Sequence, residues 1–145
     1  MNTVLRISES LSLAFHAAAY LAAAGGDTVS AARIASDLGV SANHLAKVMK
    51  RLAARGIVHS WPGPGGGYTL ARPPAEINLL DVYEAVEGPL VTDGCLLEDC
   101  PCGEVDCPLG AFVKRVGREF AERLAATRLA DFPALKVCAE RRTTR

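Results

Sequence analysis

Residues 42–54 separate into an apolar side and a basic side when they are wound as a helix. At 100° per residue, one side holds Leu45, Val48, Met49 and Leu52. The opposite side holds Asn43, His44, Lys47, Lys50 and Arg51. A glycine turn over residues 38–41 precedes this helix, and Ser41 can accept the first free backbone N–H of the helix. We therefore expect a helix with one side in a core and the other facing a polar, anionic partner.

The flanking segments complete a recognisable order of elements. Helices are expected over residues 8–24 and 30–37, because apolar residues recur there at steps of three and four. Strands are expected at residues 56–60 and 68–70, joined by a tip rich in glycine and proline. Two helices, a basic helix and a hairpin make a winged helix-turn-helix, whose basic helix fits the major groove of double-stranded DNA. The alternative is a domain that contacts only proteins, but in such a domain the basic side of the helix and the glycine-rich wing would have no function.

The expected DNA contacts come from the helices and from the hairpin tip. Residues 30–60 hold five basic residues against one acidic residue, although the whole chain has a formal net charge of zero. This part of the chain can therefore approach an anionic polymer. Side chains contact bases and phosphates, and glycines let the backbone come close. The predicted contacts are Arg33, Ser41, Asn43, His44, Lys47, Lys50, Arg51, Ser60, Trp61, Gly63, Gly65 and Gly66.

The predicted fold is mainly α, and three parts follow a winged domain at residues 1–75. Residues 76–107 hold a short helix at 79–87 and a cysteine-rich loop, residues 108–132 hold a long helix, and residues 133–145 form a tail. The periodicity predicts that the long helix runs from about residue 108 to 130. No second apolar segment follows later in the chain to cover the apolar stripe of this helix, so a second copy of the helix is the simplest partner. The predicted homodimer interface is Phe112, Val116, Phe120 and Leu124.

The sequence contains neither a predicted membrane span or secretory signal nor a recognisable catalytic set, and both points bear on where the protein acts and what class it belongs to. No apolar run approaches the ~18 residues needed to span a bilayer, and the first residues lack the pattern of a secretory signal. We expect a cytoplasmic protein with no membrane contact. No hydrolytic triad can be assembled around the three histidines, His16, His44 and His59, from the residues near them in the sequence. With no acid and base pair to name, an enzyme is not expected.

Four cysteines lie within thirteen residues, at Cys95, Cys100, Cys102 and Cys107. In a reducing compartment such a cluster indicates a metal or redox site rather than a disulfide framework. Structural zinc sites usually combine pairs from two knuckles, whereas these cysteines share one loop with five acidic residues. Three thiolates from one loop, with a further ligand from elsewhere, suit an iron-sulfur cluster. A metal-free thiol–disulfide switch is the main alternative, and a zinc site is a less favoured one.

The chain resembles the Rrf-two-type family of bacterial winged helix-turn-helix transcriptional regulators over roughly residues 5–130. The resemblance rests on residues 32–35, 38–41, 45–48 and 56–58, on the wing string Gly63-Pro64-Gly65-Gly66-Gly67-Tyr68-Thr69-Leu70-Ala71, and on Ile77-Asn78-Leu79-Leu80-Asp81-Val82 followed by the cysteines. It implies a homodimeric repressor on a palindromic operator. It also implies a 2Fe–2S or 4Fe–4S iron-sulfur cluster that reports on redox state, nitric oxide or iron.

The resemblance also assigns ligands. Family clusters use three cysteines, which here would be Cys95, Cys107 and one of Cys100 and Cys102, with Cys102 favoured. In some members an acidic residue at the start of the first helix reaches across the dimer, and Glu9 occupies that place. Many wings carry an arginine before the Gly-Pro-Gly-Gly-Gly string, where this chain has proline. The resemblance therefore implies either that readout by this wing is weaker or that it relies on Trp61 and on backbone N–H groups.

Overall fold

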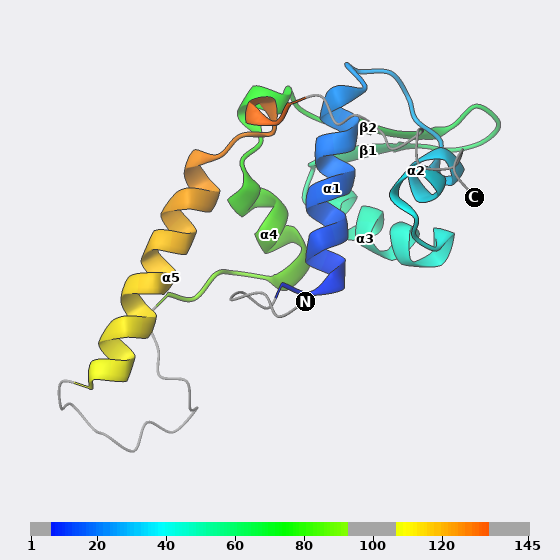
Figure 1. Ribbon diagram of the computed structural model, residues 1–145. Coiled ribbons are helices and arrows are strands. Elements are labelled where there is room, and N and C mark those ends of the chain that lie inside the picture. The colour runs from blue at the N-terminus through cyan, green and yellow to red at the C-terminus, as the bar shows by residue number, and fades with distance from the viewer. Residues whose placement is uncertain (1–6, 93–106, 134–145) are drawn as a thin grey trace, which may run out of the picture.

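The computed structural model describes residues 7–92 and 107–133 and is mainly helical, as predicted (Figure 1). Its elements are α1 (Glu9–Ala23), α2 (Ala31–Leu38), α3 (Ala42–Ala54), β1 (Val58–Trp61), β2 (Gly67–Leu70), α4 (Leu79–Glu87) and α5 (Pro108–Ala126), with 3-10 turns at Pro74–Glu76 and Leu129–Asp131. The predicted winged helix-turn-helix is confirmed: α2 and α3 follow α1, and the β1–β2 hairpin follows α3. None of the helices in the described ranges has the length and apolarity to cross a bilayer.

Serine side chains begin each of the first three helices. The hydroxyl oxygens of Ser8, Ser30 and Ser41 each accept a hydrogen bond, at 3.1–3.2 Å, from the backbone N–H three residues later. Each bond satisfies one of the donors that a helix start leaves free. Gly39 ends α2 at φ +68°, a left-handed conformation that glycine adopts without strain. Local chemistry therefore favours the turn between α2 and α3.

The core is built around α1, which stands between α4 on one side and α2 and α3 on the other (Figure 1). Ala14, Ala17 and Ala18 are fully buried, so neighbouring elements can approach the α1 backbone closely. The predicted inner side of α3 packs into this core: Leu45, Val48, Met49 and Leu52. Each of these four side chains is at most 1% exposed. The position and rotation of α3 are thus set by its apolar side.

The wing is an antiparallel hairpin whose register runs from Val58 opposite Leu70 to Trp61 opposite Gly67. Outside the hairpin, the backbone of Tyr68 exchanges two hydrogen bonds of 2.8 and 3.0 Å with Val29, which holds β2 against the segment before α2. At Gly67, a Cβ atom would lie 2.1 Å from the carbonyl oxygen of Val29. The backbone contact therefore requires glycine at this position.

Gly67→Ala is expected to lower the free energy of unfolding by at least about 2 kcal/mol, because backbone lies on both sides of the collision and neither can yield cheaply. Gly65→Ala is the matched control. Gly65 also has positive φ, +75°, but open space surrounds its Cβ position, so a loss of only about 1 kcal/mol is expected. Urea denaturation followed by circular dichroism measures both. Equal losses would show that steric contact with Val29 is not what selects glycine.

The long helix ends earlier than the predicted residue 130. α5 stops at Ala126, and Thr127 begins an extended segment. The backbone N–H of Leu129 then donates to the carbonyl of Ile77 at 2.9 Å, and the Leu129 side chain is 1% exposed. Burial of this side chain against the segment before α4 outweighs another turn of solvent-exposed helix. No glycine or proline marks the change, so the sequence carries no local stop signal there.

Candidate nucleic-acid interface

The outer side of α3 carries the predicted base-reading side chains. Asn43, Lys47 and Lys50 are exposed, directly opposite the buried side of the same helix. His44 is half-buried, and its Nε2 lies 3.4 Å from the hydroxyl oxygen of Ser10 on α1. The first turn of α3 is thus held by the Ser41 cap on one side and by α1 on the other. A fixed backbone under exposed amide and ammonium groups is what recognition of a DNA groove needs.

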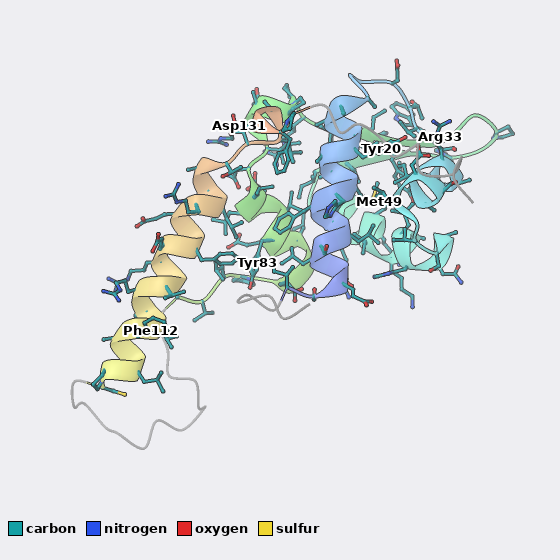
Figure 2. The ribbon with its side chains drawn as sticks, in the orientation of Figure 1. Tyr20, Arg33, Met49, Tyr83, Phe112 and Asp131 are labelled. Atoms are coloured by element: carbon teal, nitrogen blue, oxygen red, sulfur yellow. The ribbon has the colours of Figure 1, made fainter. Side chains whose placement is uncertain are left out.

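Arg33 lies at the surface on α2 and is held by a hydrogen-bond network. Its Nε donates to Asp37 at 2.6 Å, and the Tyr20 hydroxyl donates to the same carboxylate oxygen at 2.7 Å. Figure 2 shows Tyr20 and Arg33 on neighbouring helices. Burial and the Asp37 carboxylate raise the pKa of Tyr20 above its usual value, so the phenol stays a donor. The Arg33 side chain remains 65% exposed, which leaves it accessible to a phosphate.

Arg51, a predicted DNA contact, is engaged inside the chain. Its Nη1 donates to the carbonyl of Val86 at 3.3 Å, and Nη2 of Arg55 donates to the carbonyl of Glu84 at 3.4 Å. Both carbonyls belong to the last turn of α4, where the helix dipole favours a cation. Arg55 is not among the residues predicted from the sequence to act at this site, although it lies one turn after Arg51. The two arginines join the end of α3 to the end of α4, just before the cysteine loop.

The wing tip presents Ser60 and Trp61 to solvent, and Trp61 is 50% exposed. Gly63 and Gly65 have φ of +84° and +75°, and the N–H of Gly66 donates to the carbonyl of Gly63 at 3.0 Å. An added Cβ on Gly66 would lie 2.1 Å from the carbonyl oxygen of Trp61. The predicted glycines therefore form a tight, sterically defined turn.

Of the predicted metal ligands, the structure describes two. Cys95, Cys100 and Cys102 lie outside the described residues. Cys107 is half-buried at the start of α5, where its sulfur accepts the N–H of Gly110 at 3.5 Å. A helix start and an N–H donor both favour thiolate, the form that binds metal and that attacks disulfides. Cys107 thus fits either chemistry.

Glu9 is exposed in the first turn of α1, and the starts of α1 and α5 lie at separate places in the fold (Figure 1). Glu9 lines a groove of about 620 Å³ between α1 and the helix-turn-helix, together with His16, Ser41 and His44. Within the described residues no three metal-binding side chains converge. The resemblance assigns Glu9 to the cysteine loop of a partner subunit, and this role stays a prediction, because most of that loop lies outside the described residues.

The predicted dimer stripe divides into two parts. Leu124 is only 6% exposed, and the ring of Phe120 packs edge-on against Tyr83 of α4 at 6.0 Å. These two side chains pack within their own chain, because α4, which precedes α5 in the sequence, covers this half of α5. Phe112 and Val116 remain 54% and 39% exposed. Figure 2 shows Phe112 on the half of α5 that extends away from the rest of the molecule.

Comparison with known proteins places these features in a family. Residues 7–134 match the Rrf2 family, described as an iron-dependent transcriptional regulator. The chain is 36% identical over 97 residues to a putative HTH-type transcriptional regulator of Aquifex aeolicus, covering 67% of each protein. It spans about a third to a half of the length of some other curated relatives that it matches.

Solved structures have the same fold over most of the chain. CymR, the global cysteine regulator of Bacillus subtilis, superposes with a TM-score of 0.72 at 27% identity, over 88% of this chain and 95% of CymR. IscR of T. potens superposes with a TM-score of 0.68 at 28% identity, over 98% and 94%. These proteins are regulators, and their fold carries the same helix-turn-helix and wing. Since the family match covers all of the described residues, this chain belongs to the Rrf2 family of transcriptional regulators.

Proposed function

We propose that the chain binds a palindromic operator in double-stranded DNA through α3 and the wing, and represses transcription there. The observation that carries this proposal is the two-sided burial of α3. Its inner side chains are at most 1% exposed, while Asn43, Lys47 and Lys50 face solvent. A helix so held can enter a major groove without rearrangement. Near it, Arg33 and the wing offer further contacts to the backbone.

Asn43→Ala and His44→Ala are expected to relax sequence preference, each at a cost of about 1 to 3 kcal/mol on the selected site, because they remove groups at the start of α3. Lys50→Ala should instead weaken binding to all sequences alike and reduce the salt slope by about 1. The site is first selected from a random duplex library. Fluorescence anisotropy at several salt concentrations then measures the three variants.

Lys114→Ala is the control for these titrations, since it removes an exposed lysine from α5. It should leave both affinity and preference unchanged. If all three α3 variants bind DNA as the wild type does, α3 is not the helix that enters the major groove. Because His44 also contacts Ser10, its variant should additionally show a small loss of thermal stability, whereas the exposed Asn43 should not.

We further propose a homodimer formed through the exposed half of the α5 stripe, at Phe112 and Val116. Leu109, which is 55% exposed, extends the same surface. A two-fold dimer places two copies of α3 in the related orientation that a palindromic site presents. Phe120 and Leu124 then support the interface indirectly by fixing α5 on α4.

The sensor in this proposal is an iron-sulfur cluster held by Cys95, Cys107 and one of Cys100 and Cys102, with Glu9 from the partner subunit. When bound, a cluster supplies a redox-active centre whose weakest ligand can be displaced. Within the chain, Glu9 begins α1, and the next residue, Ser10, contacts His44 of α3. We propose that a change in what the Glu9 carboxylate binds reaches the start of α3 through this contact.

A thiol–disulfide switch without metal is the second candidate. It is favoured by the position of Cys107, whose sulfur at a helix start accepts a backbone N–H. A zinc site is a third possibility with the same cysteines. Colour separates the first candidate from the other two, because an iron-sulfur protein absorbs visible light, whereas zinc sites and thiols are colourless.

A further inference from the structure

α4 connects α3, the proposed DNA-reading helix, to α5, the helix of the proposed dimer. In Figure 1, α4 stands between α5 and α1, and it packs against both of them and against α3. Tyr83 of α4 contacts Phe120 of α5, while Val82 of α4 is fully buried in the core that also holds the inner side of α3. The angle between α3 and α5 therefore depends on how each of them is held on α4.

Two arginines at the end of α3 make directional bonds to the end of α4. Arg51 lies in the last turn of α3, and Arg55 is its C-cap. Nη1 of Arg51 donates to the carbonyl of Val86 at 3.3 Å, and Nη2 of Arg55 donates to the carbonyl of Glu84 at 3.4 Å. In a longer helix, the N–H of Leu90 would bond to Val86, but here it donates to the Glu84 side chain at 3.4 Å. Arg51 therefore satisfies an acceptor that the end of α4 leaves open.

These bonds add a restraint that apolar packing supplies only weakly. The burial of α3 ends with Leu52, and Ala54 and Arg55 are exposed. Apolar burial depends on area and has no preferred direction, whereas hydrogen bonds from a planar guanidinium depend on both distance and angle. The core therefore sets which side of α3 faces inward, and the arginines restrain the tilt of its last turn against α4.

This tilt matters for a palindromic operator, because two copies of α3 must meet two half-sites at once. Each base pair between the half-sites moves the second half-site by about 3.4 Å along the DNA axis and turns it by about 35°. A dimer with firmly held reading helices therefore accepts one spacing and loses affinity at the others. A dimer whose reading helices can tilt accepts several.

We propose that Arg51 and Arg55 are positioning residues that set the half-site spacing which the dimer accepts. The proposal rests on the proposed operator binding and on the proposed dimer, and it adds a determinant of specificity that lies away from the bases. The two arginines act here through α4 rather than through the DNA. Arg55 is the residue on which the test depends, because Arg51 is also a predicted DNA contact.

The experiment compares one operator at several spacings with a single half-site. The operator is selected from a random duplex library with the wild-type protein, and base pairs are then added or removed at its centre. Fluorescence anisotropy measures each affinity. A change of one base pair is expected to weaken wild-type binding about tenfold or more, because DNA or protein must be deformed to fit. Arg55→Ala is expected to reduce this penalty by at least about threefold, the order of one hydrogen bond, and to bind the half-site like the wild type.

Three further variants separate positioning from charge. Lys50→Ala is the matched contrast, since it removes an exposed cation from the same helix. It should weaken binding to the half-site and to every spacing alike, so that the spacing penalty is unchanged. Arg55→Lys keeps the charge without the planar fork and should give an intermediate penalty. Arg51→Ala should reduce the penalty as Arg55→Ala does, and any added loss on the half-site measures its contact with DNA.

The outcomes separate this proposal from the proposed function. If the Arg55→Ala protein keeps the wild-type penalty at every altered spacing, or if the wild type itself prefers no spacing, the proposal is overturned although the chain binds its operator. If Arg55→Ala weakens half-site binding as much as operator binding, the residue acts on α3 or on the DNA, and the proposal is also overturned. If the wild type binds neither duplex, the proposed function fails, and this proposal fails with it.

Discussion

Val116→Glu is expected to yield a monomer that keeps its helical content. Val116 is 39% exposed and lies one turn from Phe112, which is 54% exposed, so the new carboxylate does not disturb the core of one chain. At a two-fold interface, however, the position meets its own copy or close neighbours. A buried carboxylate without a partner costs several kcal/mol, so dimer affinity should fall by about a hundredfold or more.

Ala111→Glu is the matched control for this variant. It adds the same charge to the same helix, at an exposed position on the opposite, charged side of α5. It should remain dimeric. Multi-angle light scattering over a range of concentrations measures both, and circular dichroism checks that α5 still forms. A stable dimer of the Val116→Glu protein would place the interface on another surface.

The loss of dimerisation should also weaken DNA binding. A monomer contacts one half of a palindromic site, so Val116→Glu should bind the selected operator far more weakly than the wild type while keeping its affinity for a single half-site. An equal loss on both would mean that the substitution damages α3 itself. The half-site titration therefore distinguishes assembly from folding.

The helix-turn-helix could be predicted closely because its signals are local. Ser41 begins α3 and Gly39 ends α2 through bonds and dihedral angles that involve only neighbouring residues. The predicted bounds of α3, residues 42–54, agree with the structure, and so does its buried side. Periodicity and caps were sufficient here because tertiary packing and local preference agree.

Prediction failed where contacts between distant segments decide the outcome. The end of α5 depends on Leu129 reaching the segment before α4, 52 residues earlier at Ile77, and no local residue type announces this. Likewise, the sequence does not predict that Arg51, on the polar side of α3, donates to a backbone carbonyl of α4, and its contact with DNA stays a prediction. A helical wheel separates buried from exposed positions, but it does not say which exposed position meets another helix.

The stripe on α5 shows the same limit in another form. The spacing identifies apolar side chains that must be shielded from solvent, but α4 of the same chain already shields half of them. Tyr83 packs on Phe120, and Leu124 is buried. Spacing along one helix contains no information about which partner covers which turn. Of the four predicted interface residues, Phe112 and Val116 are left for a second copy, which is why the assembly test uses Val116.

Cys95→Ala and Cys107→Ala are each expected to abolish the visible colour of protein purified without oxygen. The proposed cluster depends on both thiolates, and the loss of either leaves too few ligands to hold iron. The negative charge of five acidic residues in the same loop disfavours free ionised thiols, whereas bound iron compensates that charge. This charge supports the proposed bound metal over the alternative of free reactive thiolates.

Only one of Cys100→Ala and Cys102→Ala should lose colour, and the one that does identifies the middle ligand. Cys138→Ala is the matched control, since it removes the fifth cysteine, which lies far from the others in the sequence. It should keep full colour. Glu9→Ala should retain iron but shift the visible spectrum, because a carboxylate from the partner subunit is replaced by water or another ligand.

Iron and sulfide counts, together with the visible spectrum, measure this series, and operator binding before and after oxidant links it to function. In the Glu9→Ala protein, the response of operator binding to oxidant should change even though the iron remains, since Glu9 and Ser10 adjoin the start of α3. Colourless wild-type protein from strictly anaerobic cells with intact cluster assembly would reject the iron-sulfur proposal. Loss of the oxidant response in Cys107→Ala would then favour the disulfide switch, because Cys107 lies at a helix start that favours thiolate.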